Sequence, residues 1–242
     1  NSFPINQSAY QIDVCLTPAL LPQYTLSDKV VVLIDVLRAT SVVCTALEEG
    51  VKAVKPVEGL HEALEHQDTR LVAAERNGQQ VPEADLGNSP LPFLQRQYEG
   101  YQLVLTTSNG TQALNQAKDA CASILIGSFL NASSLAKYLQ VAKEDVLLLC
   151  AGRHGYYSLE DAMLAGYLIA HTGPDLQPAS DAAFSIAALY QAHAADWRDL
   201  LYQGTHAQYL KSLGKTKDIE YAFQLDTYTG VPEFIENQLV IR

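Results

Sequence analysis

The apolar residues of this chain are grouped in short runs that alternate with amphipathic stretches. The clearest run, Val30–Ile34, contains five consecutive apolar residues, most of them β-branched, and indicates a strand buried on both faces. Polar residues follow it from Asp35 to Ser41, and residues 42–47 then continue as a helix that Gly50 ends. The pattern predicts that this strand turns into a helix at Asp35.

The same alternation continues along the chain. A helix start is predicted at Asn88, where a capping residue is followed closely by Pro90. The tail, residues 218–242, has no clear pattern apart from an edge strand expected near residues 239–241. Further strands are predicted at residues 51–57, 70–74, 102–106, 123–126 and 145–150, and helices at residues 60–65, 111–117, 132–141, 158–170, 182–195, 197–202 and 205–213.

Strands that alternate with helices predict an α/β fold. We expect three layers, α/β/α, with a mostly parallel central sheet and a helical C-terminal part. No shift in composition and no linker rich in serine or glycine interrupts the chain. Residues 1–242 are therefore expected to form a single domain, with residues 179–242 as a mainly helical extension that packs on or over the site.

Composition narrows the classes of function. The chain has 242 residues, 48% hydrophobic and 18% charged, and no run of the roughly 18 to 20 apolar residues that span a bilayer. We expect a cytoplasmic protein without a membrane partner, because the N-terminus also shows no targeting pattern. The net charge of −11 argues against nucleic acid as a partner. Buried free thiols are expected at the four widely spaced cysteines, Cys15, Cys44, Cys121 and Cys150.

Chemistry is expected at the turn after Val30–Ile34. In open parallel sheets, ligands bind beyond the carboxyl ends of strands, where helix N-termini present free N–H groups. Asp35 offers a carboxylate as a metal ligand or nucleophile, and Arg38 offers a bidentate clamp for an anion. Thr40 or Ser41 offers a capping hydroxyl.

Other polar clusters follow the later strands. A parallel sheet brings the carboxyl ends of its strands to one rim, so these clusters are expected to meet. Each also has a purely structural explanation, such as a turn, a surface ion pair, or a capping box between Ser158 and Asp161. The clusters lie at Glu75–Arg76, Asn88–Ser89, residues 106–111, residues 128–131 and residues 152–161.

Together these segments resemble the 2-phosphosulfolactate phosphatases of coenzyme M biosynthesis. Ala74 differs from the glycine usual in that family, and beyond Ala170 the match thins to Asp218-Ile219 and Val231-Pro232. The resemblance implies a three-layer α/β/α, magnesium-dependent phosphatase that acts on a small phosphorylated, sulfonated hydroxy acid. The matching segments, in the family's order, are Ile34 to Ser41, Glu75-Arg76, Gly87 to Pro90, Thr106 to Thr111, Asn131-Ala132, Cys150 to Gly152, Ser158 to Asp161 and Ala165-Gly166.

The family chemistry suggests a role for each polar residue. We expect Asp35 and Arg38 to be catalytic, and Asp35, Glu75 and Asp161 to hold Mg²⁺ directly or through water. The sequence leaves open whether Asp35 is instead the nucleophile. Phosphate or a second anionic group is expected to bind, besides Arg38, to the amides of Ala39, Thr40 and Ser41 and to Arg76, Asn88, Ser108, Asn109, Gly110, Asn131 and Arg153.

Two other functions remain compatible with the sequence. The chain could bind a phosphorylated metabolite without hydrolysing it, as a sensor or carrier, or it could be a phosphatase for another small acid. The apolar helix at residues 182–195 could also pack against a second copy of the chain, which would make a homo-oligomer.

Overall fold

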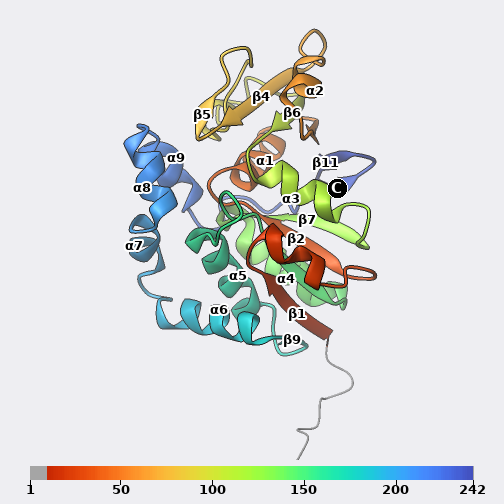
Figure 1. Cartoon of the computed structure of the whole chain (residues 1–242), viewed down its shortest axis with the longest axis vertical. Coiled ribbons are helices and arrows are strands. Elements are labelled where there is room, and N and C mark those ends of the chain that lie inside the picture. Colours follow the sequence, from red (N-terminus) through yellow and green to blue (C-terminus); the bar gives the residue numbers. More distant parts are fainter. Residues whose placement is uncertain (1–9, 242) are drawn as a thin grey trace, which may run out of the picture.

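A single sheet organises the fold of the computed structural model, which describes residues 10–241 (Figure 1). Its strand order is β5-β4-β6-β3-β11-β10-β7-β2-β8-β1-β9. The strands are β1 (Tyr10–Cys15), β2 (Val30–Ile34), β3 (Ala53–Pro56), β4 (Leu71–Arg76), β5 (Gln79–Gln80), β6 (Gln102–Thr106), β7 (Ser123–Gly127), β8 (Val146–Cys150), β9 (Leu176–Pro178), β10 (Glu233–Ile235) and β11 (Gln238–Val240).

Helices follow most of the strands and also make up much of the C-terminal part. Short 3-10 helices lie at η1 (Pro18–Gln23), η2 (Leu91–Phe93) and η3 (Phe129–Asn131). The α-helices are α1 (Ala39–Glu48), α2 (Leu60–Leu64), α3 (Gly110–Ala117), α4 (Ala132–Ala142), α5 (Leu159–His171), α6 (Asp181–Ala192), α7 (Trp197–Tyr202), α8 (Thr205–Ser212) and α9 (Thr216–Ala222).

The sheet consists of two parallel groups joined by an antiparallel hairpin. Strands β7, β2, β8, β1 and β9 form one group, and β4, β6 and β3 form the other. The hairpin β10–β11 lies between them, because Glu233 of β10 pairs with Leu125 of β7 and Leu239 of β11 pairs with Val54 of β3. The expected strand near residues 239–241 therefore exists, but its predicted place at the edge of the sheet is wrong.

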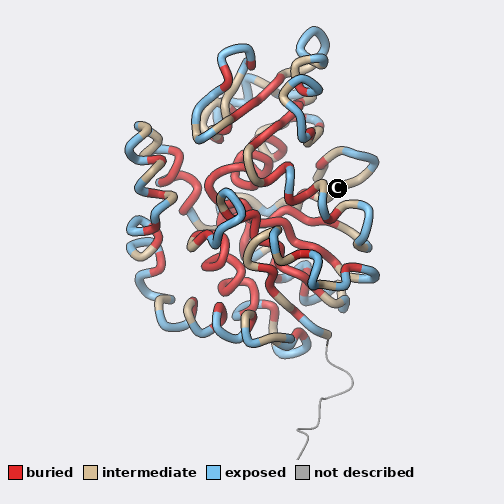
Figure 2. Tube along the Cα trace, viewed as in Figure 1, coloured by how far each residue is buried: buried red, intermediate tan, exposed pale blue. Residues whose placement is uncertain are grey.

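Alternate residues of β2 point to opposite faces of the sheet, as the continuous apolar run requires. Val32 and Ile34 belong to a core shared with α4, α5 and α6, whereas Val31 and Leu33 belong to a second core shared with α1 and α3. Figure 2 shows the buried strands between more exposed outer helices. The predicted α/β/α layers and mostly parallel sheet are thus confirmed.

Several expectations about single elements can be compared with the structure. The helix expected after Asn88 is only the short η2, whereas β2, β6 and α7 have the expected bounds. Strands β1, β5, β9 and β10 and helix α9 were not predicted. Within residues 10–241 all four cysteines are free, as expected, and no helix combines the length and apolar character needed to cross a membrane.

The C-terminal helices run along one side of the molecule. In Figure 1, α6 lies at the bottom of the molecule near β1 and β9, and α7, α8 and α9 follow one another up the left side. Trp197 and Leu201 of α7, Leu210 of α8 and Ile219 of α9 join the core beneath α5. This packing brings α8 and α9 next to the turn that follows β2.

Candidate active site

A small pocket opens where four parallel strands end and α8 covers them. Residues from the ends of β2, β4, β6 and β8 meet there although their positions in the sequence are far apart, as expected for one rim of a parallel sheet. The lining consists of Asp35, Leu37, Arg38, Glu75, Asn77, Gly78, Asn88, Ser108, Asn109, Arg153, His154, His206, Tyr209 and Leu210.

Asp35 lies at the floor of the pocket, one residue after β2, and is only 5% exposed. Burial raises the pKa of its carboxyl from 3.8 to about 6; the positive charge of His206 opposes this shift and the negative charge of Glu75 adds to it. The α-carbon of Gly110 approaches closely, since a β-carbon there would lie 2.7 Å from Oδ2 of Asp35. Gly110 thus makes room for the carboxylate rather than lining the pocket.

Arg38 is buried and fixed in place by residues distant in sequence. Its Nη1 forms an ion pair with Asp218 of α9, and its Nη2 donates a hydrogen bond of 2.9 Å to the carbonyl oxygen of Gly78. Asp218 also accepts a hydrogen bond of 2.9 Å from the hydroxyl of Ser89. The peptide bond between Leu37 and Arg38 is cis. The charge of Arg38 is therefore balanced within the protein, and its guanidinium is held rigidly at the pocket wall.

Glu75 presents its carboxylate from the end of β4. The hydroxyl of Ser108 donates a hydrogen bond of 3.2 Å to Oε1, and the backbone amide of Gly78 donates to the same oxygen. The backbone amide of Ser108 donates to Oε2 at 3.4 Å. These contacts orient a carboxylate that is 6% exposed, and they join the ends of β4 and β6.

The first turn of α1 is already hydrogen-bonded to Asp35. The amide of Thr40 donates to the carbonyl oxygen of Asp35 at 3.0 Å, and the amide of Ala39 donates to Oδ1 at 3.4 Å. The hydroxyl of Ser41 donates to the carbonyl oxygen of Val36. None of Ala39, Thr40 and Ser41 lines the pocket. The amides of Ala39 and Thr40 therefore bind Asp35 and do not face the pocket.

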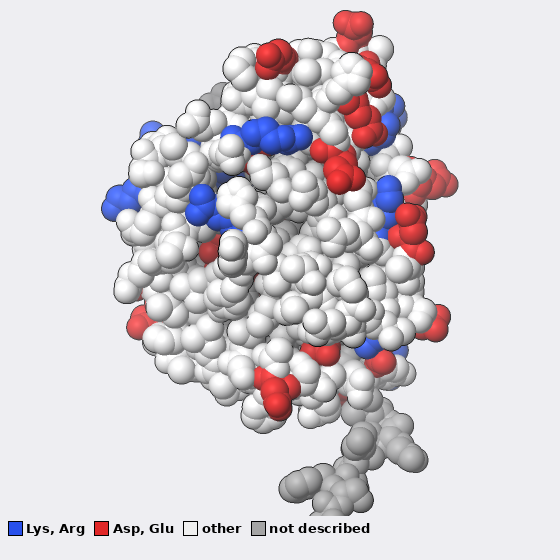
Figure 3. Space-filling view, viewed as in Figure 1, with Lys and Arg blue, Asp and Glu red and all other residues white. Residues whose placement is uncertain are grey.

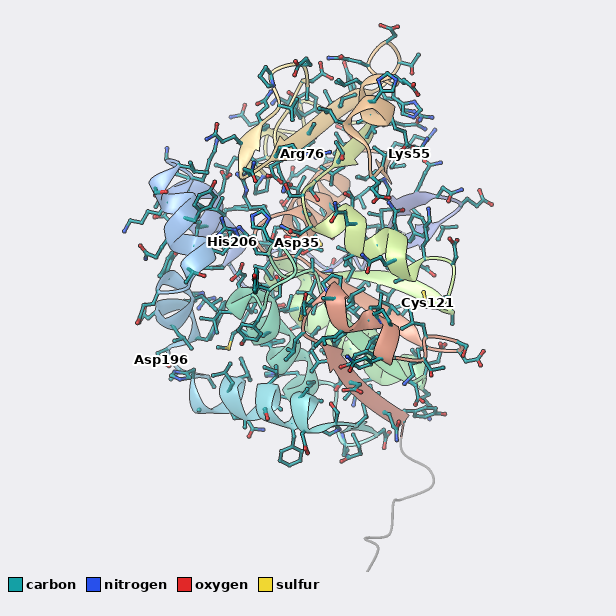
Figure 4. All side chains as sticks on the ribbon, viewed as in Figure 1. Asp35, Lys55, Arg76, Cys121, Asp196 and His206 are labelled. Atoms are coloured by element: carbon teal, nitrogen blue, oxygen red, sulfur yellow. The ribbon has the colours of Figure 1, made fainter. Side chains whose placement is uncertain are left out.

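Two other residues expected to bind anions lie outside the pocket lining. Arg76 donates to the carbonyl oxygens of Glu75 and Glu58 and to the hydroxyl of Thr106. Figure 4 shows Arg76 at the β4–β6 end of the molecule, above Asp35 and His206. Asn131 is fully buried, where its side chain accepts a hydrogen bond from the amide of Ser128 and donates to two carbonyl oxygens.

Asp161 has a partner for each carboxylate oxygen. The amide of Val36 donates to Oδ1 at 2.9 Å, and the amide of Gly152 donates to Oδ2 at 3.1 Å, so the side chain ties together the turns after β2 and β8. Burial and the charges of Glu160 and Asp35 raise its pKa well above the usual value. Asp161 does not line the pocket, and the Ser158 side chain makes no capping hydrogen bond.

Asn88, Asn109 and Arg153 do line the pocket, as the rim argument predicted. Asn88 is 5% exposed, and among residues 10–241 its Oδ1 has no hydrogen-bond partner. Asn109 uses its Oδ1 to accept a hydrogen bond from the amide of His154. The guanidinium of Arg153 lies 4.1 Å from the ring centroid of Tyr209, a cation–π contact.

Sequence reasoning missed the contributions of α8 and α9. His206 and Tyr209 of α8 line the pocket, and Asp218 of α9 holds Arg38. Nδ1 of His206 lies 2.7 Å from Oε1 of Glu160 in a buried ion pair. Figure 4 shows Asp35 and His206 beside each other at the centre of the molecule. A single histidine on a short amphipathic helix carries no local signal, and only Asp218 lay in a segment with a motif match.

The oxygen atoms around Asp35 suit a small divalent cation. Within the described part of the chain, no three histidine, cysteine, aspartate or glutamate side chains are grouped as a complete metal site. However, Mg²⁺ commonly takes one or two carboxylates and completes its coordination with water and substrate phosphate. Asp35 and Glu75 could supply two carboxylates to such an ion, and the unpartnered Oδ1 of Asn88 could supply a third hard ligand.

Most of the chain is similar to known proteins. Among them are proteins named "Probable 2-phosphosulfolactate phosphatase" from three organisms. That of Caldanaerobacter subterraneus subsp. tengcongensis is 36% identical over 224 residues, covering 89% of this chain and 91% of that protein. That of Thermotoga petrophila is 37% identical over 212 residues, which cover 87% of this chain and 91% of that protein. That of Synechocystis sp. is 36% identical over 232 residues, which cover 92% of this chain and 95% of that protein.

A family model described as 2-phosphosulpholactate phosphatase matches residues 15–237. The matched range includes β2, the whole pocket lining and the helices α8 and α9. It extends well beyond residue 170, where the motif resemblance thinned. The chain therefore belongs to the 2-phosphosulpholactate phosphatase family, as its sequence motifs predicted.

Proposed function

We propose that this enzyme hydrolyses the phosphomonoester of 2-phosphosulfolactate, or of a similar small phosphorylated hydroxy acid, with Mg²⁺ as cofactor. The observation that carries the proposal is the convergence of Asp35, Glu75, Asn88 and two arginines in one pocket. Carboxylates would gain nothing in a site that binds only phosphate, unless a metal lies between them and the anion. The pocket thus favours hydrolysis over a purely binding function.

Asp35, Glu75 and Asn88 would hold the metal ion. When bound, Mg²⁺ would neutralise charge on the phosphoryl oxygens and orient the ester for in-line displacement. The rigid guanidinium of Arg38 would bind the phosphoryl group from the side of α9. Ser108, whose amide and hydroxyl both bind Glu75, keeps that carboxylate turned toward the pocket.

Arg153 is the residue we assign to the second anionic group of the substrate. Of the two arginines in the pocket lining, Arg38 is paired with Asp218, whereas Arg153 has no acidic partner among residues 10–241. Its position over the Tyr209 ring limits its freedom without neutralising its charge. In Figure 3, acidic side chains lie mostly along the upper, right and lower edges of this face, and several basic ones lie toward the upper left.

Phosphate release tests this assignment directly. We expect release from 2-phosphosulfolactate with Mg²⁺, and no release with excess chelator. Release from another small ester instead would change the substrate but keep the reaction. Stabilisation by inorganic phosphate without metal, together with no release from any ester, would show a binding protein and overturn the proposal.

Arg153→Met provides a second arm of the same experiment. It should raise KM for 2-phosphosulfolactate by about tenfold or more, because a charged hydrogen bond is worth roughly 1.5 to 3 kcal/mol. It should change KM less than threefold for a phosphomonoester with no second anionic group. Equal changes for both esters would show that Arg153 contacts phosphate.

A further inference from the structure

The buried pair formed by His206 and Glu160 has no part in the proposed binding of metal or phosphate. His206 projects from α8 into the pocket wall, and Glu160 lies near the start of α5. Nδ1 of His206 and Oε1 of Glu160 are 2.7 Å apart, and the two side chains are 12% and 4% exposed. An ion pair this deeply buried is held in one geometry, unlike the exposed pair between His193 and Asp196.

The pair fixes the orientation of the imidazole ring. A carboxylate accepts hydrogen bonds, and Oε1 of Glu160 lies at hydrogen-bond distance from Nδ1 of His206, so Nδ1 donates and Glu160 accepts. Among residues 10–241 no protein group hydrogen-bonds Nε2 of His206, which leaves that nitrogen for a ligand in the pocket.

The other charged and titratable side chains of the pocket lining are weaker candidates than His206 for donating a proton to a ligand. The other charged or titratable side chains in the lining are Asp35, Glu75, Arg38, Arg153, His154 and Tyr209. Asp35 and Glu75 are assigned to the metal, and both arginines always keep their protons. His154 is exposed and makes no ion pair among the described residues, so nothing comparable holds its ring. His206 is thus the one titratable donor in the described lining that a buried carboxylate orients.

We propose that His206 is the general acid of the reaction and that Glu160 is its positioning residue. This inference rests on the proposed phosphatase function. A water molecule attacks phosphorus, and the bond between phosphorus and the ester oxygen breaks. Its electron pair remains on the ester oxygen, which takes the proton from Nε2 of His206 and leaves as the hydroxyl of the product acid. The attacking water loses a proton, and Nε2 of the neutral imidazole regains one before the next turnover, either that proton or one from solvent. Protonation of a leaving group by a positioned side chain typically raises the reaction rate by about 10²-fold to 10⁴-fold.

Two esters with different leaving groups distinguish a general acid from a residue that only binds substrate or stabilises the fold. The alkoxide of a hydroxy acid needs a proton as it departs, whereas 4-nitrophenolate is stable as an anion. In His206→Asn we expect kcat for 2-phosphosulfolactate to fall about 10²-fold or more, and kcat for 4-nitrophenyl phosphate to fall less than fivefold. His193→Asn, which removes an exposed histidine from a similar pair outside the pocket, should change neither rate.

Equal losses for the two esters in His206→Asn would overturn the proposal. If the wild-type protein hydrolyses alkyl esters other than 2-phosphosulfolactate, those esters replace it in the comparison and only the substrate assignment fails. If the wild-type protein hydrolyses no ester with Mg²⁺ present, the proposed function and this inference both fail.

A double-mutant cycle tests the role of Glu160. Glu160→Gln should lower kcat for the alkyl ester by about tenfold in the wild-type background, but by less than twofold when His206→Asn is already present. Independent losses in the two backgrounds would show that Glu160 does not act through His206. Because each single change leaves one buried partner uncompensated, folding of each variant is checked by its melting temperature. If a single variant does not fold, the double variant, in which both charges are removed, gives the same ratio between the two esters.

Discussion

At the scale of single residues, Gly110 controls the space in which Asp35 lies. A β-carbon at this position would lie 2.7 Å from Oδ2 of Asp35 and 2.8 Å from the β-carbon of Ala39, both closer than ordinary contacts. We expect Gly110→Ala to displace the carboxylate, to lower kcat/KM at least tenfold and to destabilise the fold by about 1 to 3 kcal/mol. Steady-state kinetics and urea denaturation measure the two effects.

Gly59→Ala is the matched control for this substitution. The nearest atom to its added β-carbon, in the side chain of Glu62, would lie 3.8 Å away, an ordinary contact remote from the pocket lining. Activity and stability should stay close to wild type. If Gly110→Ala behaves like this control, Asp35 does not depend on the close approach of α3.

The ion pair between Arg38 and Asp218 is a second feature that single substitutions can test. Both side chains are almost fully buried, so Asp218→Asn leaves an uncompensated guanidinium in the interior. We expect a loss of about 3 kcal/mol in the free energy of unfolding, measured by urea denaturation. Adding Arg38→Met to this variant should recover part of the stability but no activity. A loss below about 0.5 kcal/mol for Asp218→Asn would mean that the pair is solvated.

Sequence reasoning at this scale found the residues that follow apolar strands. Asp35, Ser108 and Arg153 come just after a strand and Glu75 lies at the end of one, and the parallel sheet brings the four together. His206 and Asp218 reach the pocket only because α7, α8 and α9 fold back along the side of the sheet. That path depends on packing between residues far apart in sequence, which no local pattern encodes.

At the scale of elements, sequence patterns predicted the central strands well and the hairpin poorly. Strand β2 has five consecutive buried residues and therefore a clear signature. Strands β10 and β11 have three residues each and mostly half-buried side chains, so their alternation is too short to place them in the sheet. The hairpin closes the gap between the two parallel groups, and this role is set by its pairing partners rather than by its own sequence.

Leu239 offers a test of this central position. It is 2% exposed, pairs with Val54 and belongs to the core beneath α1 and α3. Leu239→Ala should therefore cost about 2 to 5 kcal/mol in the free energy of unfolding, as for other buried leucines. Val141→Ala, at a position 70% exposed, should cost less than about 0.5 kcal/mol. Similar costs for the two variants would place the hairpin at an unpacked edge.

At the scale of the whole molecule, the acidic pocket links metal binding to the pH dependence of stability. The unfolded chain releases the Asp35 proton near its usual pKa of 3.8, whereas the folded protein holds it until about pH 6. Without metal, the folded state binds more protons across this range. Stability contributed by Asp35 is therefore complete below about pH 4 and is lost as the pH rises to 6, by on the order of 3 kcal/mol.

Asp35→Asn removes the titration of this carboxyl. The difference in stability between wild type and this variant therefore isolates the contribution of Asp35 from that of every other titratable group. In chelator, the free energy of unfolding of wild type relative to Asp35→Asn should fall between pH 4 and pH 7, as measured by urea denaturation. Mg²⁺ should then reverse the loss at pH 7.5 in wild type, by about 2.7 kcal/mol at a hundredfold excess over its Kd, and should leave Asp35→Asn unchanged. Parallel stability curves for the two proteins would mean that Asp35 is solvated. Equal stabilisation of both by Mg²⁺ would remove Asp35 from the metal site, because the ion would then bind without its charge.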